Sequence, residues 1–374
     1  MKRVAGALLL PAVFVCSASA AEPVKVSLAG KRPAPIVGRA STVRLTVRPA
    51  SFSGALRVTA SGPRRISVRA TGRRGSYRAR LVFSSPGLWR LSARAGGTTS
   101  RLGGVRVRRA PARPLAFTEP TSIDLEPSGK LLLVEFSRGR VLQVDPATGH
   151  VIAVATSLDQ PYAVVRAPSG SIYLSRENQL LRFSGVAPPT TVAEVPAGVE
   201  IGPIAVAPNG DLYYATATQI FRLPGGTGPS VHIAGTGAEG GGGDGGPALD
   251  AQFSSPHGLA VAADGTLLVS DRGNDRVRRI DPTTGMIASF AQVGEPYGID
   301  VARDGTVYVI DGKLKQVVRV SPFGASLGPL GPAFAVPYDV EVTDGGGAYL
   351  LEAGPVGHVR LIAPNGTVTT VSRR

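Results

Sequence analysis

A single motif recurs six times between residues 115 and 374, and its spacing restricts the fold more than any other feature. Each copy is an apolar segment that ends at a glycine, as in Pro256-HGLAVAAD-Gly265. Successive closing glycines are 41, 40, 55, 40 and 41 residues apart, at Gly129, Gly170, Gly210, Gly265, Gly305 and Gly346. The long third interval contains a glycine-rich run, residues 235–246. A regular period of this length indicates a fold built from repeated units.

Each period contains the signals of four antiparallel strands. The apolar segment is the first strand, and Asn209-Gly210 or Asp264-Gly265 supplies the left-handed residue that its turn needs. A second apolar run follows, as at residues 267–269, and a third stops at a proline such as Pro282, which cannot donate to a sheet. A fourth run, as at residues 286–290, completes the unit. Six such periods predict a six-bladed β-propeller of four-stranded blades.

The copy that follows the glycine-rich run resembles the NHL repeat. The residues that carry the resemblance are Ala234 to Gly237, Gly243 to Ala248, Pro256 to Val261, Asp264 to Val269, Asp271, Asn274 and Arg276 to Pro282. The other five copies are degenerate but stay in register with it. The resemblance covers residues 115–374, implies a six-bladed propeller, and points to a bacterial, exported protein of the NHL-repeat type.

Charge divides the chain near Pro114. Residues 22–114 contain 21 Lys and Arg but one acid, Glu22, whereas residues 115–374 contain 18 Lys and Arg and 25 acids. The net charge of +15 therefore arises from the N-terminal part, and the C-terminal part is mildly acidic. Such a change in composition predicts two domains, with a short linker at residues 111–114.

Residues 21–110 are predicted to form a basic, immunoglobulin-like β-sandwich. Seven runs alternate apolar and polar residues with a period of two, which indicates strands with one buried face. The runs are residues 24–28, 43–47, 56–60, 66–70, 77–83, 88–93 and 105–109. Seven short strands in one small domain are typical of this sandwich. Trp89, the one tryptophan of the chain, is expected to fill its core. The whole chain is thus predicted to be all-β.

Many arginines of this module occupy the outward positions of the alternation, such as Arg78 with Arg80 and Arg106 with Arg108. Three interpretations stay open: a solvated surface, a surface that binds an anionic cell-surface polymer or lipid, and a surface that docks on the acidic propeller. Nucleic acid is disfavoured, because no aromatic residues alternate with the arginines to stack on bases.

Residues 1–20 are predicted to be a signal peptide. Lys2 and Arg3 precede an apolar run, and small residues lead to a cleavage site before Ala21. A lipoprotein anchored through Cys16 is disfavoured, because the bulky Phe14 and Val15 precede that cysteine. The protein is therefore expected to be secreted or extracytoplasmic, without cysteine and without a transmembrane segment after cleavage.

Candidate ligand-binding residues come from the mouth of the propeller channel, where loops enter the inner strands. The positions after the opening residue of each copy are Thr121, Tyr162, Gly202, His257, Tyr297 and Tyr338. Six residues after each closing glycine come Glu135, Arg176, Thr216, Asp271, Asp311 and Glu352. From these two sets the predicted ligand-binding residues are Tyr162, Arg176, Tyr297 and Tyr338.

His257 and Asp271 form the candidate catalytic pair. One interpretation makes His257 a general base or metal ligand that a carboxylate orients. The other has Asp271 stabilising its own turn while His257 lines the channel. No metal-ligating residue and no cofactor is predicted, although a divalent metal would be expected if the protein were an enzyme. The small number of histidines, four, argues against a histidine-built metal cluster.

Two enzyme families with this architecture match the chain only in part. In the gluconolactonase-like (SMP-30) family a Glu, an Asn and an Asp surround a divalent metal, and these positions fall near Glu119 and on His257 and Tyr297. In the streptogramin-lyase-like family, the Pro-His-Gly motif and its following acid resemble His257 and Asp271, although the family has Glu there. That family's other histidine and acid fall near Gly202 and on Ser255.

We therefore expect an exported binding or scaffold protein whose channel mouth recognises a peptide, a sugar or a protein. The Arg-rich module would hold it to an anionic surface. The alternative is a metal-dependent lyase or a lactonase-like hydrolase that acts around His257.

Overall fold

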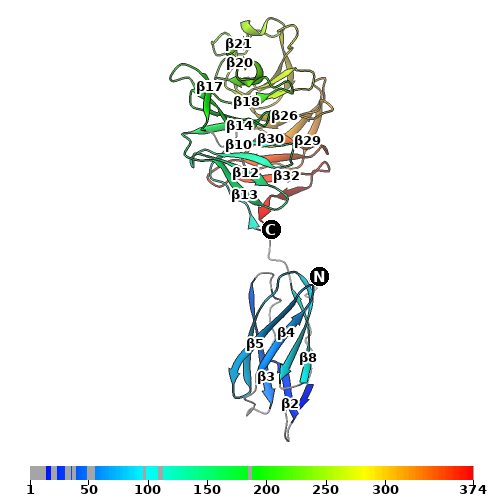
Figure 1. The fold of residues 1–374 in the computed structure, drawn as a ribbon. Coiled ribbons are helices and arrows are strands. Elements are labelled where there is room, and N and C mark those ends of the chain that lie inside the picture. Colours follow the sequence, from blue (N-terminus) through cyan, green and yellow to red (C-terminus); the bar gives the residue numbers. More distant parts are fainter. Residues whose placement is uncertain are drawn as a thin grey trace. The chain divides into compact units, whose positions relative to one another are not determined.

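The computed structural model describes residues 14–17, 23–29, 35, 39–48, 55–95, 98–107, 113–183 and 188–373. The chain divides into two compact units, Met1–Pro111 and Ala112–Arg374, which Figure 1 draws as ribbons. No helix among the described residues is long and apolar enough to cross a membrane. The two units are described separately.

The first unit is built from strands, and a strand forms at each of the seven runs expected from the sequence, although residues 108–109 of the last run lie outside the described residues and its strand begins at Thr98. The seven strands are β2 (Pro23–Leu28), β3 (Ala40–Arg48), β4 (Leu56–Ser61), β5 (Arg65–Arg73), β6 (Ser76–Val82), β7 (Gly87–Ala95) and β8 (Thr98–Val107). An eighth, β1 (Phe14–Ser17), pairs with β2. β1 falls inside the predicted signal peptide, most of which lies outside the described residues.

The prediction of an immunoglobulin-like sandwich requires correction, because the strands do not form two separate sheets. They make one continuous sheet in the order β1-β2-β3-β6-β5-β4-β7-β8. The reason is the length of β5. Its residues Arg65–Ala70 pair with β4, and its last residues, 71–73, form a hairpin with β6 that joins the two layers. The module therefore resembles a two-sheet sandwich only loosely.

Trp89 lies at the centre of the first unit, as expected from the sequence. Its side chain is completely buried, and its Nε1 donates to the Ser85 carbonyl at 3.1 Å. The Phe83 ring packs edge-on against it with centroids 5.2 Å apart. Apolar residues from β2, β3, β4, β6, β7 and β8 surround this pair in one core.

The second unit consists of six four-stranded antiparallel sheets, which confirms the predicted six-bladed propeller. The strands of the first three blades are β10 (Pro120–Leu125), β11 (Leu131–Glu135), β12 (Arg140–Asp145), β13 (His150–Ala155), β14 (Pro161–Arg166), β15 (Ile172–Arg176), β16 (Gln179–Phe183), β17 (Thr190–Glu194), β18 (Ile204–Val206), β19 (Leu212–Ala215), β20 (Ile220–Leu223) and β21 (Val231–Ala234).

The last three blades follow the same plan. Their strands are β22 (Pro256–Val261), β23 (Leu267–Asp271), β24 (Arg276–Ile280), β25 (Ile287–Gln292), β26 (Pro296–Val301), β27 (Val307–Asp311), β28 (Gln316–Val320), β29 (Ser326–Leu330), β30 (Pro337–Val342), β31 (Ala348–Glu352), β32 (His358–Ile362) and β33 (Val368–Thr370). Short 3₁₀ helices η1 (Pro224–Gly226), η2 (Ala248–Asp250) and η3 (Arg272–Asn274) lie in the loops. In Figure 1 the inner strands β10, β14, β18, β26 and β30 gather near the middle of the unit.

The propeller closes through the segment that precedes its first blade. β9 (Arg113–Pro114) pairs with β34 (Ser372–Arg373), and Phe117 forms a bridge with Gly357 in the last blade. Arg113 and Pro114, predicted as linker, therefore belong to the propeller, whereas residues 111 and 112 of that linker lie outside the described residues. Each blade keeps its own four consecutive strands.

Two glycines allow neighbouring inner strands to approach each other. A Cβ on Gly258 would lie 2.6 Å from the Tyr297 carbonyl oxygen of the next blade. A Cβ on Gly298 would lie 2.5 Å from the carboxylate and 2.6 Å from the Cα of Asp339. Because the second contact involves backbone, a side chain there would push two blades apart.

We expect Gly298→Ala to lower the free energy of unfolding of the propeller by about 1–3 kcal/mol, as overpacking does elsewhere. Gly345→Ala is the matched control, because nothing lies within 4 Å of a Cβ at Gly345. Thermal unfolding of both variants checks this. Equal midpoints for the two would show that the inner strands have room to separate.

Candidate ligand site in the propeller channel

The channel contains a polar cavity of about 170 Å³ that is lined by inner-strand residues from all six blades. Tyr162, His257 and Tyr338, three of the residues expected at the mouth, line it together with Thr121. Each comes directly after the first residue of its inner strand, so the propeller symmetry brings them to one end of the channel. The fourth, Tyr297, packs against the ring of His257.

These side chains form a connected aromatic cluster. The Tyr162 hydroxyl lies 3.2 Å from His257 Nε2 and 3.3 Å from the Tyr338 hydroxyl. The imidazole stands edge-on to Tyr297 and Tyr338, with centroids 4.6 and 4.8 Å away. Gly202 occupies the corresponding position in the blade between those of Tyr162 and His257, where a Cβ would lie 3.7 Å from the Ala215 carbonyl oxygen and 4.0 Å from Tyr162. We call Tyr162, His257, Tyr297 and Tyr338 the mouth cluster.

His257 is held neutral. Burial lowers the pKa of its imidazole to about 3, and the positive charge of Arg272 acts in the same direction. Its Nδ1 is buried and has no hydrogen-bond partner on any other described residue; the residue's own backbone is the one further polar group that acts on the ring, and it opposes the lowering of the pKa. One of the two ring nitrogens of a neutral imidazole donates and the other accepts. The cluster therefore contains one unsatisfied polar atom, which costs about 1–3 kcal/mol unless water or a ligand meets it.

Arg272 belongs to this site, although we did not predict it. Its guanidinium carbon lies 4.7 Å from the centre of the Tyr297 ring, and the side chain reaches Glu295 at 4.0 Å. Its charge also acts on the hydroxyls of Tyr162 and Tyr338. Its place in the sequence was a signal, because Arg272 directly follows Asp271, one of the residues expected at the mouth. In the structure Asp271 pairs there with Pro256.

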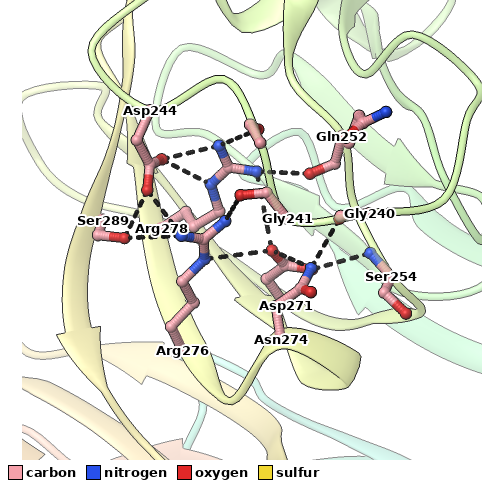
Figure 2. A network of polar contacts seen from close by, with 11 residues as sticks. Gly240, Gly241, Asp244, Gln252, Ser254, Asp271, Asn274, Arg276, Arg278 and Ser289 are labelled. Carbon is pink, nitrogen blue, oxygen red and sulfur yellow. Dashed lines mark hydrogen bonds and ion pairs between the residues drawn. The ribbon is translucent and has the colours of Figure 1, made fainter.

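Asp271 does not orient His257. Its carboxylate accepts from the Ser254 N–H at 3.0 Å and from the Asn274 amide at 2.9 Å, as Figure 2 shows. Arg276 and Arg278 lie 3.5 and 3.7 Å from the same carboxylate. None of its contacts among the described residues is with His257. Of the two interpretations of this aspartate, the geometry matches stabilisation of its own loop.

The bond from the Ser254 N–H to the Asp271 carboxylate has counterparts in other blades, which explains why the second strands end in an acidic residue. In four blades the acid accepts from the backbone N–H two residues before the proline that opens the inner strand. The pairs are Thr118 with Glu135, Ser254 with Asp271, Gly294 with Asp311, and Ala335 with Glu352. These acids fix the loops that enter the channel mouth. Arg176, predicted to bind ligand, instead donates to Gln179 at 2.9 Å and does not line the channel cavity.

A polar network next to Asp271 holds the glycine-rich loop in place (Figure 2). Arg278, which is completely buried, donates to Asp244 and to the carbonyls of Gln252 and Gly242. Arg276 bonds Asp244 and the Gly241 carbonyl. The two arginines of the NHL-like motif therefore satisfy backbone carbonyls of a loop whose other backbone bonds include those to Gln252, Phe253 and Ile287.

Four carboxylates deeper in the channel were also missed: Asp124, Asp300, Asp339 and Glu341. An inner strand has a free edge toward the channel, and its N–H groups need acceptors. These carboxylates are the acceptors, and each accepts from a backbone N–H of a neighbouring blade at 2.7–3.1 Å. The donors to Asp124, Asp300, Asp339 and Glu341 are the N–H groups of Arg166, Val342, Ile123 and Leu125 respectively. The signal was an acidic residue within a run that otherwise has the pattern of a buried strand: Asp124, Asp300 and Glu341 lie four positions after the opening proline, and Asp339 lies two positions after it.

Burial raises the pKa values of these four groups. It raises the pKa of Asp124 and of Asp339 to about 7 and that of Asp300 to about 6. The pKa of Glu341 is also raised, by burial first and then by the negative charges of its neighbours. Near neutral pH the channel wall therefore presents a mixture of ionised and protonated carboxyl groups, of which the protonated ones both donate and accept hydrogen bonds.

The residues present do not fit a metal centre. No group of three or more His, Cys, Asp or Glu among the described residues could hold a metal ion. At the positions that the gluconolactonase-like family would use, Glu119 is exposed, and His257 and Tyr297 replace an amide and a carboxylate.

Residues 253–280 match the family model of the NHL repeat, which confirms the repeat at the copy where the resemblance is strongest. No curated protein matches the sequence. Among solved structures, virginiamycin B lyase from Staphylococcus aureus is 15% identical over 69% of this chain and 87% of its own, with a TM-score of 0.52. A gluconolactonase from Xanthomonas campestris is 16% identical over 67% and 88%, with a TM-score of 0.53.

A Bacteroides thetaiotaomicron protein of unknown function is 15% identical and covers 89% of this chain and 97% of its own, with a TM-score of 0.53. At these identities the likeness concerns the fold. The chain is therefore an all-β protein with a six-bladed propeller that contains an NHL repeat, and the propeller's structural neighbours include a lyase and a lactonase.

Proposed function

We propose that the propeller is a binding module that recognises a small hydroxyl-rich group, such as the terminal sugar of a glycan, at the mouth of its channel. The observation that carries this proposal is His257, whose buried Nδ1 lacks a partner beside a polar cavity of about 170 Å³. A ligand hydroxyl that reached this nitrogen would satisfy it in either tautomer, because a hydroxyl both donates and accepts.

The chemistry of the lining supports this ligand class. The hydroxyls of Thr121, Tyr162 and Tyr338 offer donors and acceptors, and the carboxyls below them, which titrate near neutral pH, add acceptors and, where protonated, donors. The ring faces of the mouth cluster suit the apolar face of a sugar. Arg272, at the rim, would donate hydrogen bonds to a carboxylate on the same ligand. A cavity this small admits one such unit, so the remainder of a larger ligand would lie outside.

Calorimetric titration with a panel of mono- and disaccharides, sugar acids and short peptides tests the proposal. We expect one sugar class to bind, with His257→Ala weakening it about tenfold or more through the lost hydrogen bond and packing. His150→Ala is the matched control, because His150 is exposed at the start of β13, on the outer strand of its blade. Tight binding of peptides alone, or equal affinity in both variants, would contradict it.

A lyase-type reaction is the second candidate. His257 is neutral, the form that a general base needs, although a pKa lowered to about 3 makes it a weak base near neutral pH; the propeller shares its fold with virginiamycin B lyase. Because the residues present do not fit a metal centre, no metal-assisted step is derived for this chain. Calorimetric titration with Mg²⁺, Ca²⁺ and Zn²⁺ on the natural sequence and on His257→Ala separates the two candidates. Metal binding that is lost in His257→Ala would favour the lyase-type reaction.

We also propose that the protein acts outside the cytoplasm, because Lys2, Arg3, the apolar run and the small residues before Ala21 have the pattern of a cleaved signal peptide. N-terminal sequencing of secreted protein is expected to start at Ala21. A start at Met1 in purified protein would contradict the proposal.

A further inference from the structure

Positive charge in the described part of the first unit has nothing to balance it. Fifteen arginines between Arg39 and Arg106 are exposed, and the described residues of this unit include no Asp or Glu. In the propeller, by contrast, most ion pairs join an arginine to an acid that holds a loop or strand, such as Arg140 with Glu135. No described carboxylate of the first unit therefore forms an ion pair with its arginines.

Three of these arginines form a row across neighbouring strands. Arg57 on β4 lies directly opposite Arg69 on β5 and directly opposite Arg94 on β7. All three are exposed. Opposed side chains in an antiparallel pair have Cβ atoms about 4.5–5.5 Å apart, and like charges at such positions destabilise the sheet. A row of this kind works against the fold, so a partner that neutralises it is its simplest explanation.

The row belongs to a larger surface on the outward side of β5, β4, β7 and β8. Arg65 and Arg90 both lie opposite Ser61, and Arg101 lies opposite Ser92. Hydroxyl groups of Ser67, Ser92 and Thr99 stand between the guanidinium groups. We define Arg57, Arg65, Arg69, Arg90, Arg94 and Arg101 as the arginine face.

We propose that the arginine face binds a linear acidic polysaccharide whose carboxylates repeat along the chain. An arginine guanidinium matches a carboxylate with two parallel hydrogen bonds, which a lysine cannot do. A linear polymer would meet several arginines at once, and the intervening hydroxyls would bond its sugar hydroxyls. This inference is independent of the ligand proposed for the propeller.

The composition of the face argues against other classes of partner. The outward positions of these four strands carry no aromatic residue among those described, so they provide no platform on which nucleic-acid bases could stack. Leu88, at one end of β7, is the one large exposed apolar side chain described on these strands, which is too little for insertion into a lipid surface.

Binding of the intact purified protein to polygalacturonate, measured by calorimetry over a salt series, tests the inference. We expect binding at low ionic strength that weakens as salt rises. The triple variant Arg57→Gln, Arg69→Gln, Arg94→Gln is expected to bind about tenfold more weakly or worse, since it loses the whole row. Fluorescence of Trp89, the single tryptophan, reports whether the first unit stays folded in each variant.

The matched control is Arg44→Gln, Arg78→Gln, Arg80→Gln, which removes three exposed arginines from β3 and β6, including the directly opposed pair Arg44 and Arg78, and lowers the net charge by the same amount as the first variant. It is expected to bind nearly as the natural sequence does. The inference is overturned by equal losses in the two variants, by no binding at low salt, or by undiminished binding to the methyl-esterified polymer. Tighter binding of duplex DNA or of anionic phospholipid vesicles than of polygalacturonate overturns it as well.

Discussion

Arg278→Ala is expected to lower the free energy of unfolding of the propeller by about 3–5 kcal/mol, the usual result of removing one partner of a buried ion pair. The Arg278 side chain is 0% exposed. It bonds Asp244 at 2.7 Å and the Gln252 carbonyl at 2.7 Å, and lies 3.7 Å from Asp271. Without the guanidinium, the buried carboxylate of Asp271 loses a nearby positive charge, and Asp244 and two loop carbonyls each lose one donor.

Arg279→Ala is the matched control, because Arg279 is the next residue of β24 and is exposed. It should change the free energy of unfolding by no more than about 0.5 kcal/mol. The single tryptophan lies in the first unit, so tryptophan fluorescence follows that unit and the tyrosine signal of near-UV circular dichroism follows mainly the propeller. A loss confined to the tyrosine signal supports the network in Figure 2; equal effects of both substitutions would show that this network is dispensable.

The propeller is expected to be less stable at pH 8 than at pH 5. Burial raises the pKa of Asp124 and of Asp339 to about 7 and that of Asp300 to about 6. Their protonated forms are favoured in the folded state, so the stability they contribute is complete below the unfolded pKa near 4 and is lost as the pH rises through 6–7. Each group changes the free energy of unfolding by at most about 1.4 kcal/mol per pH unit in this window.

His257 acts in the opposite direction, because its lowered pKa makes the protein lose stability as the pH falls below about 6.5. His257 is a single group, whereas four channel carboxyls act in the other direction, so the carboxyls determine how the free energy of unfolding changes between pH 5 and pH 8. Arg166 and Glu126, at the other end of the channel, also act on Asp124, the first lowering and the second raising its pKa.

Glu341→Gln isolates this effect. Glu341 accepts from the Leu125 N–H through one oxygen, and a glutamine carbonyl is able to accept the same bond without titrating. The variant should flatten the dependence of unfolding free energy on pH between 5 and 8. Asp344→Asn, at an exposed position, serves as the control and should leave the slope unchanged. Denaturant unfolding at each pH provides the measurement, and parallel curves for Glu341→Gln and the natural sequence would refute the role of the channel carboxyls.

The propeller could be predicted because its signals are local and repeated. The closing glycines and the opening prolines recur in register, and each copy supports the others. The same repetition placed Tyr162, His257, Tyr297 and Tyr338 at one end of the channel. It could not indicate that their rings contact each other, because those contacts depend on the closing of six blades around an axis.

The roles of the acids required the structure. Asp271 was paired with His257 from its spacing, yet its carboxylate turns to the Ser254 N–H and to Asn274. In the first unit the strands were predicted well, but a sandwich was expected where one continuous sheet forms. The alternation of residues says which side of a strand is buried, and it does not say that β5 is long enough to pair with both β4 and β6.

The central claim is that the mouth cluster holds a neutral histidine with a free nitrogen that a ligand satisfies. Nuclear magnetic resonance of protein with ¹⁵N-labelled histidine rings tests it most directly, because the chain has only 4 histidines and His257→Ala assigns the signal. We predict that His257 stays neutral as the pH falls from 8 to 4, and that a bound sugar shifts its Nδ1 resonance. Protonation of His257 near its ordinary pKa of about 6.5, or a bound sugar that leaves its ring nitrogens unchanged, would contradict the claim.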